Sequence, residues 1–463
     1  MVKLKGSYTV TPAVPTPAGK LWLSEVDQCK PMTHAPIVYF YNAPLTDNSI
    51  ITTTISTMDT MRDSLSKVLV KFYPLAGRVQ WIEGGRLELD CNSMGVQLFE
   101  AESDMEISGF GDFSPTPKMR ELIPHIDYSQ PITEIPLLLL QLTQFRCGGR
   151  SIGVAISHAV VDGQSAMHFT NTWAKVTRGE NLEETPLPFI DRTVLRRSEY
   201  PPTARFNHPE FDPPPFLIGQ TDGEEERKKE TTVVMLKLTR VQVETLKKKA
   251  NAATMTGCRP YTRFESIAAH IWRCASKAHR HECEQLTHVR IAVDSRNRLR
   301  PVLPNNFFGN TVFVTNATSR AGELMGNPLG FAASRIREAV DKMNDEYFKS
   351  AIDFLRGQAD MRPFRTAFHT VGCAQGAFLG NPNLAITSWL GLPIYGADFG
   401  WGKPIYMGPV ALGFEGRSYI IPGPDDEDGS FIVPLRLMAA HMEDFKKFFY
   451  GEISKFLNLK AAY

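Results

Sequence analysis

The alternation of hydrophobic and polar residues predicts that strands and helices follow one another along the first half of the chain. Period-two patterns, typical of half-buried strands, occupy three segments: 86–91, 96–102 and 136–157. The third segment is long enough for two strands, which would be joined at Gly148 and Gly149. Helical periodicity occupies two segments, 57–72 and 164–179. This order of elements predicts an α/β fold.

The second half repeats this order after a break. Residues 200–232 are rich in proline and charge, which opposes regular packing, so we interpret them as a crossover loop. Beyond the loop, the patterns predict a strand, a helix, a strand, a long helical region and a closing helix, at 232–238, 261–278, 288–296, 330–360 and 441–457. A chain of 463 residues is too long for one core. We therefore expect two domains, 1–199 and 233–463, each a mixed sheet with flanking helices.

Composition narrows the class of partner. Basic and acidic side chains number 51 and 50, so no net charge attracts nucleic acid or an anionic membrane, and a small-molecule partner is favoured. The longest apolar run, IPLLLLQL, is far shorter than the ~20 residues that span a bilayer. The N-terminal segment has no apolar core of signal-peptide length. These features predict a soluble, cytoplasmic protein.

The cysteines give little sign of a disulfide framework or a metal site. The seven cysteines are scattered and form no Cys-x-x-Cys pair, which is typical of free thiols in a reducing compartment. Cys274, His279, His281 and Cys283 are close in sequence, and all could bind zinc. Their spacing matches no common zinc pattern, so we expect no metal.

The segment SHAVVDGQS, residues 157–165, carries candidate chemistry. His158 continues the buried parity of a predicted strand and stands where that strand ends, before a turn that Gly163 permits. A neutral imidazole there can accept a proton near working pH, so His158 is a candidate general base. The alternative is a buried structural histidine, because the pattern His-x-x-x-Asp often arises by chance. Asp162 fits a structural acid better than a catalytic relay partner.

The segment YGADFGWGKP, residues 395–404, is the second unusual stretch. Its glycines, proline and tryptophan specify a rigid loop rather than a generic turn. The letters DFG also occur in protein kinases, but the chain has neither a Gly-rich phosphate loop nor a His-Arg-Asp catalytic loop, which argues against a kinase.

Together, HAVVDG and DFGWG make the sequence resemble the BAHD family of plant acyl-CoA-dependent acyltransferases. The resemblance spans the whole chain and includes three further motifs in the family's order: FYPLAGR at 72–78, DSRNRLRP at 294–301 and FFGN at 307–310. DFGWG is highly specific for the family, whereas HxxxDG indicates the family only when the other motifs are also present. Within the family, FDPPPFLIGQTDGEEERKKETTVVML and GNPNL look most like segments of spermidine hydroxycinnamoyl transferases.

The resemblance implies a chloramphenicol-acetyltransferase-like α/β fold of two domains, with a tunnel between them. CoA thioester and acceptor would enter the tunnel from opposite ends. It further implies that His158 is the catalytic base and that Asp162 and Gly163 are structural, with Asp162 paired to Arg296. It implies structural roles for three residues of the second motif: Asp398, Gly400 and Trp401. Acyl-CoA is then a co-substrate, and no cofactor is needed.

The resemblance also suggests where the substrates bind. His34 and Tyr39 lie in a segment that lines the acceptor side in the family, and Thr262 and Arg263 lie in a segment that approaches CoA. Shikimate and quinate enzymes typically carry an arginine at the position of Gly391, where its fork clamps a carboxylate. Glycine cannot do this, which favours a polycationic acceptor, although glycine could also be a neutral packing choice.

The sequence therefore predicts a monomeric N-acyltransferase that moves a hydroxycinnamoyl group (coumaroyl, caffeoyl or feruloyl) from CoA to spermidine. One alternative is an O-acyltransferase for shikimate, quinate or another alcohol. Another is a non-catalytic ligand-binding relative, against which the intact His158 and Gly163 argue. A thioester carbonyl is already electrophilic, so either reaction needs a base and oxyanion donors rather than a covalent nucleophile.

Overall fold

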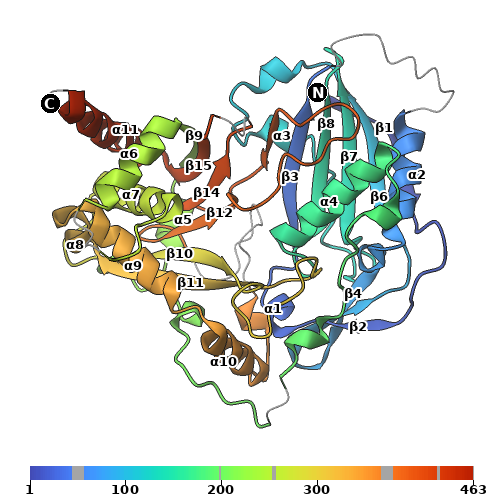
Figure 1. Cartoon of the computed structure of the whole chain (residues 1–463), viewed down its shortest axis with the longest axis horizontal. Helices are drawn as coiled ribbons and strands as arrows, with labels where there is room; N and C mark the ends of the chain where they lie inside the picture. Colours follow the sequence, from blue (N-terminus) through green and yellow to red (C-terminus); the bar gives the residue numbers. More distant parts are fainter. Residues whose placement is uncertain (44–56, 198–199, 253–256, 366–378, 425–427, 462–463) are drawn as a thin grey trace.

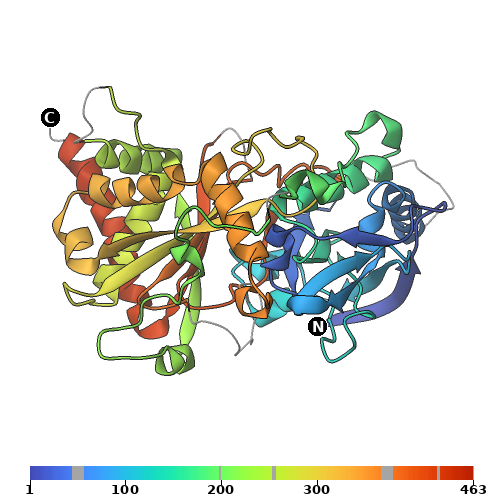
Figure 2. The ribbon, with the colours of Figure 1, turned by 90° about the horizontal axis from the view of Figure 1, so that it is seen from below.

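Two domains lie side by side in the computed structural model of the chain (Figure 1). The N-terminal half forms one domain, and most of the C-terminal half forms the other. After a turn of 90°, the two groups of strands and helices are seen to meet along one junction (Figure 2). The structure describes residues 1–43, 57–197, 200–252, 257–365, 379–424 and 428–461.

The N-terminal domain is built on a six-stranded mixed sheet with the strand order β1-β6-β7-β8-β3-β13. The bounds of these strands are Val2–Val10 (β1), Val96–Ser103 (β6), Leu138–Phe145 (β7), Arg150–Ser157 (β8), His34–Tyr41 (β3) and Tyr406–Pro409 (β13). β6 and β7 are parallel, and the other neighbours are antiparallel. A smaller sheet has the order β2-β5-β4 and consists of Lys20–Trp22, Arg86–Asp90 and Arg78–Ile82.

Helices cover this sheet because their apolar residues share one face. The helices of the domain are Glu25–Gln28 (α1), Thr57–Leu69 (α2), Pro117–Arg120 (α3) and Gly163–Thr177 (α4). In α4, Ala166, Phe169 and Trp173 follow a spacing of three and four, which places them together on the buried side. α4 packs against α2 over the sheet (Figure 1), and their buried residues share one core with the strands.

The C-terminal domain is built on a second six-stranded mixed sheet, in the order β11-β10-β12-β14-β15-β9. The bounds are Val312–Arg320 (β11), Leu286–Asp294 (β10), Leu384–Ser388 (β12), Arg417–Pro422 (β14), Phe431–Met438 (β15) and Thr231–Leu238 (β9). β10, β12 and β14 run parallel to one another. The helices are Glu224–Lys228 (α5), Arg240–Ala250 (α6), Arg263–Ala278 (α7), Ala321–Gly326 (α8), Leu329–Asp341 (α9), Asp345–Arg356 (α10) and Ala439–Ala461 (α11).

The two faces of this second sheet differ. On β10, Val289, Ile291 and Val293 are buried in the core that the strands share with α6, α7, α9 and α11. Successive side chains of a strand point to opposite faces, so Arg290 and Ala292 point away from those helices. They line a cavity toward the N-terminal domain. The sequence pattern of β10 therefore builds a core on one side and an interdomain wall on the other.

One strand crosses the expected domain boundary. β13 belongs to the C-terminal half of the sequence but pairs antiparallel with β3, with Tyr406 level with Phe40, and so completes the N-terminal sheet. The expected division at 199 and 233 therefore leaves out a segment that returns to the first domain. Residues 200–230 contain the short helix α5 and a 3-10 turn at Pro209–Phe211. They lead into β9.

Two general features complete the description of the chain. Within the described residues, no helix combines the length and apolar character needed to cross a membrane. Six cysteines in those ranges are free thiols. Cys373, the seventh, lies outside the described residues.

Candidate active site

A cavity of about 260 Å³ lies between the two domains. The N-terminal domain contributes the start of β3, the end of β8 and the first turn of α4, whereas the C-terminal domain contributes the open faces of β10, β11, β12 and β14. His158 belongs to the lining. The charged side chains among the described lining residues are Lys30, Arg290, Arg296, Arg417, Asp162 and Asp294.

The end of a buried strand fixes the position of His158. It is the first residue after β8, and its N–H donates to the Thr33 carbonyl (3.2 Å) beside the start of β3. Its own carbonyl accepts a hydrogen bond from Asn310 Nδ2 (3.0 Å), which belongs to the C-terminal domain. The side chain is partly buried. Both domains therefore hold the backbone of His158 at the edge of the cavity.

The surroundings of His158 keep its ring neutral. Its pKa is lowered to about 4, chiefly by burial and next by the charge of the Lys30 ammonium. A hydrogen bond to its own backbone, the charge of Asp162 and a hydrogen bond with Asn310 act in the opposite direction. A neutral imidazole at pH 7 can accept a proton, which a base requires.

Replacing Lys30 by Met is expected to raise the pKa of His158, because the change removes a nearby cation while keeping an unbranched side chain of similar length. NMR titration of the His158 ring in the wild type and in Lys30→Met measures the shift. Lys118→Met, on the exposed side of α3, provides a control for the loss of one positive charge. An unchanged midpoint in Lys30→Met would mean that Lys30 does not act on the ring.

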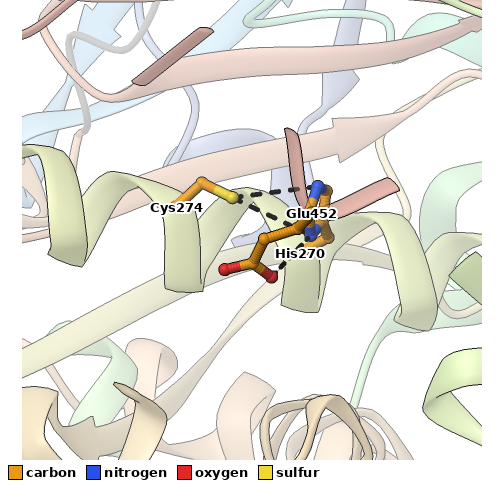
Figure 3. A group of neighbouring side chains, drawn as sticks. All are labelled: His270, Cys274 and Glu452. Atoms are coloured by element: carbon orange, nitrogen blue, oxygen red, sulfur yellow. Dashed lines mark hydrogen bonds and ion pairs between the residues drawn. The ribbon is translucent and has the colours of Figure 1, made fainter. Parts of the chain in front are cut away.

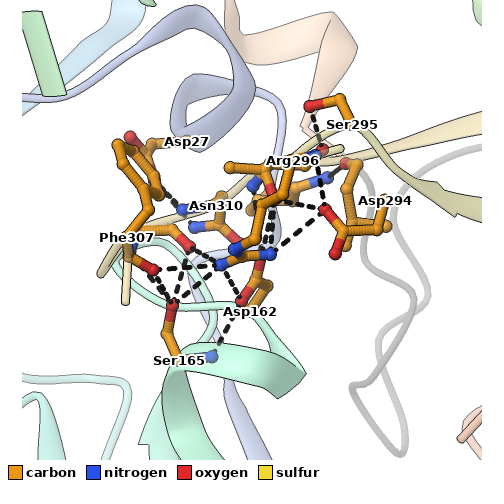
Figure 4. Close-up of polar contacts among 12 residues, drawn as sticks. Asp27, Asp162, Ser165, Asp294, Ser295, Arg296, Phe307 and Asn310 are labelled. Carbon is orange, nitrogen blue, oxygen red and sulfur yellow. Dashed lines mark hydrogen bonds and ion pairs between the residues drawn. The ribbon is translucent and has the colours of Figure 1, made fainter. Parts of the chain in front are cut away.

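Asp162 and Arg296 form a buried ion pair that joins the two domains (Figure 4). Arg296 Nη1 donates to Asp162 Oδ2 (2.8 Å), and Nη2 donates to Oδ1 (2.9 Å), so the guanidinium and the carboxylate meet as a two-pronged fork. Asp162 is also the N-cap of α4 and accepts from the Ser165 N–H (3.0 Å). The structure thus brings together the two residues that the sequence analysis paired.

Neighbouring residues add further polar contacts to both members of this pair. Thr311 donates its N–H to Asp162 Oδ2 (3.1 Å), and Arg296 also contacts Asp294 (3.2 Å). Burial acts to raise the pKa of Asp162, but the Arg296 charge and the donors around it lower that pKa on balance. Asp162 therefore stays ionised and paired with Arg296. Gly163, the next residue, opens α4 on the exposed side and lines the cavity.

Asn310 is a positioning residue that the sequence analysis missed. Its Nδ2 group donates both to the His158 carbonyl (3.0 Å) and to Asp27 Oδ1 (2.8 Å). Asp27 in turn forms a buried ion pair with Arg192 (3.3 Å). Asn310 is the last letter of the FFGN motif, so the available signal was that motif. The sequence could not show that Asn310 contacts His158, because the two residues are 152 positions apart in the chain.

The DFGWG loop is held by hydrogen bonds within itself and by side chains of the N-terminal domain. Asp398 Oδ1 accepts from the N–H groups of Gly400 (2.8 Å) and Gly402 (3.0 Å). These glycines have φ values of 95° and 87°, a region that glycine adopts readily. The Trp401 ring packs edge-on against Tyr41, with 5.3 Å between the ring centres. None of the described lining residues comes from this loop.

Two residues expected on the acceptor side are buried elsewhere. His34 contacts Tyr128 Oη (3.0 Å) and the Pro136 carbonyl (2.8 Å) through its two ring nitrogens, and it lines a separate cavity of the N-terminal domain. Tyr39 has no exposed surface, and its hydroxyl donates to the sulfur of Met167 (3.3 Å). The structure does not place either residue in the lining of the interdomain cavity.

Gly391 lies beside the cavity and not in its lining. It is exposed, and a Cβ atom added there would meet no atom of the described residues within 4 Å. Its neighbours Trp389 and Leu392 do line the cavity. A longer side chain at 391 therefore has space beside these two lining residues.

The two residues expected near CoA begin α7 and are engaged in local contacts. Thr262 is the N-cap of α7, where its hydroxyl accepts from the Glu265 N–H (3.2 Å), and Glu265 accepts from the Thr262 N–H in return (2.6 Å). Arg263 is exposed and pairs with Glu244 (2.9 Å). Neither residue lines the interdomain cavity, and their expected contacts with CoA stay predictions.

The residues considered as zinc ligands have separate partners. His279 bonds to Glu415 (3.0 Å) at the end of α7, and His281 bonds to Asn381 (2.7 Å). Their rings stack with 5.3 Å between the ring centres, but neither histidine belongs to a group of ligand atoms, among the described residues, that could hold one ion. The set that includes Cys274 and Cys283 therefore does not converge on one point.

A different group of possible ligands lies inside the C-terminal domain (Figure 3). His270 and Cys274 are one turn apart on α7, and Glu452 approaches them from α11. Glu452 already forms ion pairs with Lys277 and Lys249. Burial raises the pKa of the Cys274 thiol well above its usual range, which opposes the thiolate that a metal needs. This group fits an internal ion-pair cluster better than a metal centre.

Three cationic residues of the cavity lining were not predicted as site residues from the sequence: Lys30, Arg290 and Arg417. Each comes from a different part of the chain and stands outside the family motifs quoted above. Together with a neutral imidazole, they make the cavity suited to an anionic substrate that must lose a proton.

Comparisons with known proteins give this geometry a family. A family model described as the Transferase family matches residues 1–451. The chain is 52% identical over 459 residues to the hydroxycinnamoyl-CoA:piscidic acid hydroxycinnamoyltransferase of Actaea racemosa, covering 98% of this chain and 100% of that protein. It is 44% identical over 451 residues to the shikimate O-hydroxycinnamoyltransferase of Nicotiana tabacum, covering 97% and 99%.

Solved structures support the expected fold. Vinorine synthase matches with a TM-score of 0.71 at 23% identity, covering 96% of both chains. TRI101 of F. graminearum, complexed with coenzyme A and deoxynivalenol, matches with a TM-score of 0.70 at 19% identity, covering 92% of this chain and 96% of that one. These matches confirm the two-domain chloramphenicol-acetyltransferase-like fold. Together with the family match, they show that the chain belongs to the Transferase family and, within it, to the BAHD group that its motifs resemble. The protein is therefore an acyltransferase.

Proposed function

We propose that the protein transfers a hydroxycinnamoyl group from its CoA thioester to an alcohol oxygen of an acceptor that carries carboxylates. The observation that carries this proposal is the charge of the cavity. Lys30, Arg290 and Arg417 line it together with His158, whereas both carboxylates of the described lining bond to Arg296. The relatives support the same class, since the acceptors in their names, piscidic acid and shikimate, are hydroxy acids.

The proposed chemistry uses His158 as the general base. His158 takes the proton of the acceptor hydroxyl as its oxygen attacks the thioester carbonyl, so that a C–O bond forms and the carbonyl oxygen becomes negative. When the C–S bond breaks, the imidazolium returns the proton to the CoA sulfur. The products are an ester and free CoA. The ring begins this cycle neutral, because its pKa is lowered to about 4.

Spermidine, the acceptor expected from the sequence, fits the cavity poorly. Its amines have pKa values near 10, so each is protonated at pH 7. A polycation would then approach three fixed cations, and like charges in a partly dry site repel. Among the described residues, the lining holds no carboxylate beyond Asp162 and Asp294. The relatives reported above do not support spermidine either.

An acceptor panel tests the proposal. The purified protein is incubated with p-coumaroyl-CoA and piscidic acid, shikimate, malate or spermidine in turn, and products are identified by mass. We expect esters of the hydroxy acids, with kcat/KM for the best acid roughly 10- to 100-fold above that for spermidine, because charge repulsion disfavours the polycation. Reactions without protein measure spontaneous transfer. A spermidine amide as the dominant product would overturn the proposal, and no product from any acceptor would favour a ligand-binding relative.

A further inference from the structure

Two arginines stand on one row of the C-terminal sheet. Arg290 of β10 is level with Ala385 of β12, and Ala385 is level with Arg417 of β14. Neighbouring strands lie ~4.8 Å apart, so the two arginine Cα atoms are separated by about 10 Å on one face. Ala385, between them, carries only a methyl group. Both arginines therefore extend over it into the interdomain cavity, which both of them line.

Arg417 is buried, Arg290 is half-buried, and the two charges are close enough to affect one another. Arg417 is 7% exposed, and its Nε atom has no hydrogen-bond partner within the described residues. Arg290 Nη1 donates to the Glu210 carbonyl (3.0 Å). Burial lowers the pKa of Arg290 to about 10, and the charge of Arg417 also acts to lower it. Two cations held this close together are costly unless an anion joins them.

The carboxylates of the described cavity lining are engaged with another cation. Asp162 and Asp294 both bond to Arg296. The Glu210 carboxylate accepts a hydrogen bond from Tyr347 (2.6 Å). The Glu210 charge also favours the charged form of Arg290, but no carboxylate of the described lining remains for Arg417, so the row of two arginines carries an excess of positive charge. A substrate carboxylate fits this excess, because a guanidinium presents a planar fork that matches a carboxylate.

We propose that Arg290 and Arg417 bind the two carboxylates of a hydroxy dicarboxylic acid, whose hydroxyl group then faces His158. This inference rests on the proposed function and names the residues that select its acceptor. A dianion compensates both guanidinium groups, whereas a monoanion leaves one of them uncompensated. The Arg417 guanidinium also lies over the Tyr419 ring, 4.5 Å from its centre, which holds the fork in a fixed plane.

Arginine variants combined with an esterified acceptor test the pairing. Piscidic acid and malate serve as dicarboxylate probes, and their dimethyl esters lack the charges. In Arg290→Met and in Arg417→Met, we expect KM for the diacids to rise roughly 10- to 100-fold, as lost charged hydrogen bonds predict. The esters should be poor acceptors for the wild type and should lose little further in the variants. If the loss caused by the arginine substitution and the loss caused by esterification do not add, the arginine and the carboxylate contact each other.

Controls separate this contact from other roles. Arg335→Met removes a half-exposed arginine of α9 that pairs with Glu338 and lies over the Phe331 ring, both on the same helix, and it should leave both KM values unchanged. KM for p-coumaroyl-CoA should change less than about threefold in the cavity variants, because the proposed anion is the acceptor. Arg417→Lys keeps the charge but loses the fork, so we expect an intermediate KM. It also provides a folded alternative if a methionine variant fails to fold.

The outcomes distinguish this inference from the proposed function. If the wild type esterifies no acid, the proposed function fails. If the wild type uses the diacids and the methionine variants keep its KM, the function stands and the arginine pair is wrong. A rise in KM for p-coumaroyl-CoA alone would mean that the pair binds CoA phosphates, which also overturns the inference. Thermal stabilisation of the wild type by malate without donor, absent in Arg417→Met, would support it independently of turnover.

Discussion

His158→Ala is expected to lower kcat for acyl transfer by roughly 10²- to 10⁴-fold, the range over which general-base catalysis contributes. The backbone contacts of residue 158, with the Thr33 carbonyl and with Asn310 Nδ2, involve main-chain atoms that alanine keeps. The ring itself is partly exposed at the cavity edge. The fold should therefore survive, while the proton acceptor is lost.

The pH dependence gives a second measure of the same role. A base must be neutral, so kcat/KM of the wild type should be level near pH 7 and should fall as the pH drops toward about 4, where His158 takes up a proton. In His158→Ala this acid limb should disappear. His125→Ala, which removes an exposed histidine, controls for the loss of an imidazole. Near-normal turnover in His158→Ala, with an intact melting transition, would exclude His158 as the base.

Local sequence patterns predicted most elements because the side chains that define them contact the nearest core. The strands expected at 86–91 and 96–102 match β5 and β6, and the two strands expected within 136–157 match β7 and β8. The helical region expected at 330–360 is two helices, α9 and α10. The break occurs where Asn344 caps the second helix through the Tyr347 N–H. A capping asparagine inside a helical pattern was the signal for that break.

Long-range pairing was not predictable from those patterns. β13 is four residues long and contains glycine and proline, so its sequence gives no strong strand signal. β13 forms because it pairs with the edge of β3, which lies more than 360 residues away in the chain, as the pairing of Tyr406 with Phe40 shows. The sequence therefore predicted the two sheets and missed the strand that ties the second half to the first.

The residues of the candidate site, like the elements of the fold, were predicted only in part from the sequence. Motif resemblance pointed to His158 and to the pairing of Asp162 with Arg296, and the structure holds these residues together at the cavity. It gave no sign of Arg290 and Arg417, because either one alone reads as an ordinary charged residue in a strand. Their relation arises from the parallel register of β10, β12 and β14, which only the folded sheet defines. For this reason the proposed acceptor differs from the one expected from the sequence.

Asp162→Asn is expected to destabilise the protein by ~3–5 kcal/mol, because it removes the buried carboxylate partner of Arg296 and leaves only the partly exposed Asp294 beside that buried charge. Asparagine can still cap α4, since it is as good an N-cap residue as aspartate. The loss should therefore come from the ion pair. Asp191→Asn changes an exposed N-cap aspartate in the same way and should change the free energy of unfolding by far less.

The pH dependence and a double variant isolate the pair. The folded-state pKa of Asp162 is lowered, so its contribution to stability is present above the unfolded pKa of ~3.9 and is lost as the pH falls through the folded value. The stability difference between the wild type and Asp162→Asn should therefore shrink below about pH 4. Asp162→Asn combined with Arg296→Met should recover part of the loss, because no buried charge is then left alone. Unfolding by urea at pH 7 and pH 3 measures both effects; an unchanged unfolding free energy with lost turnover would instead make Asp162 a direct partner of His158 in catalysis.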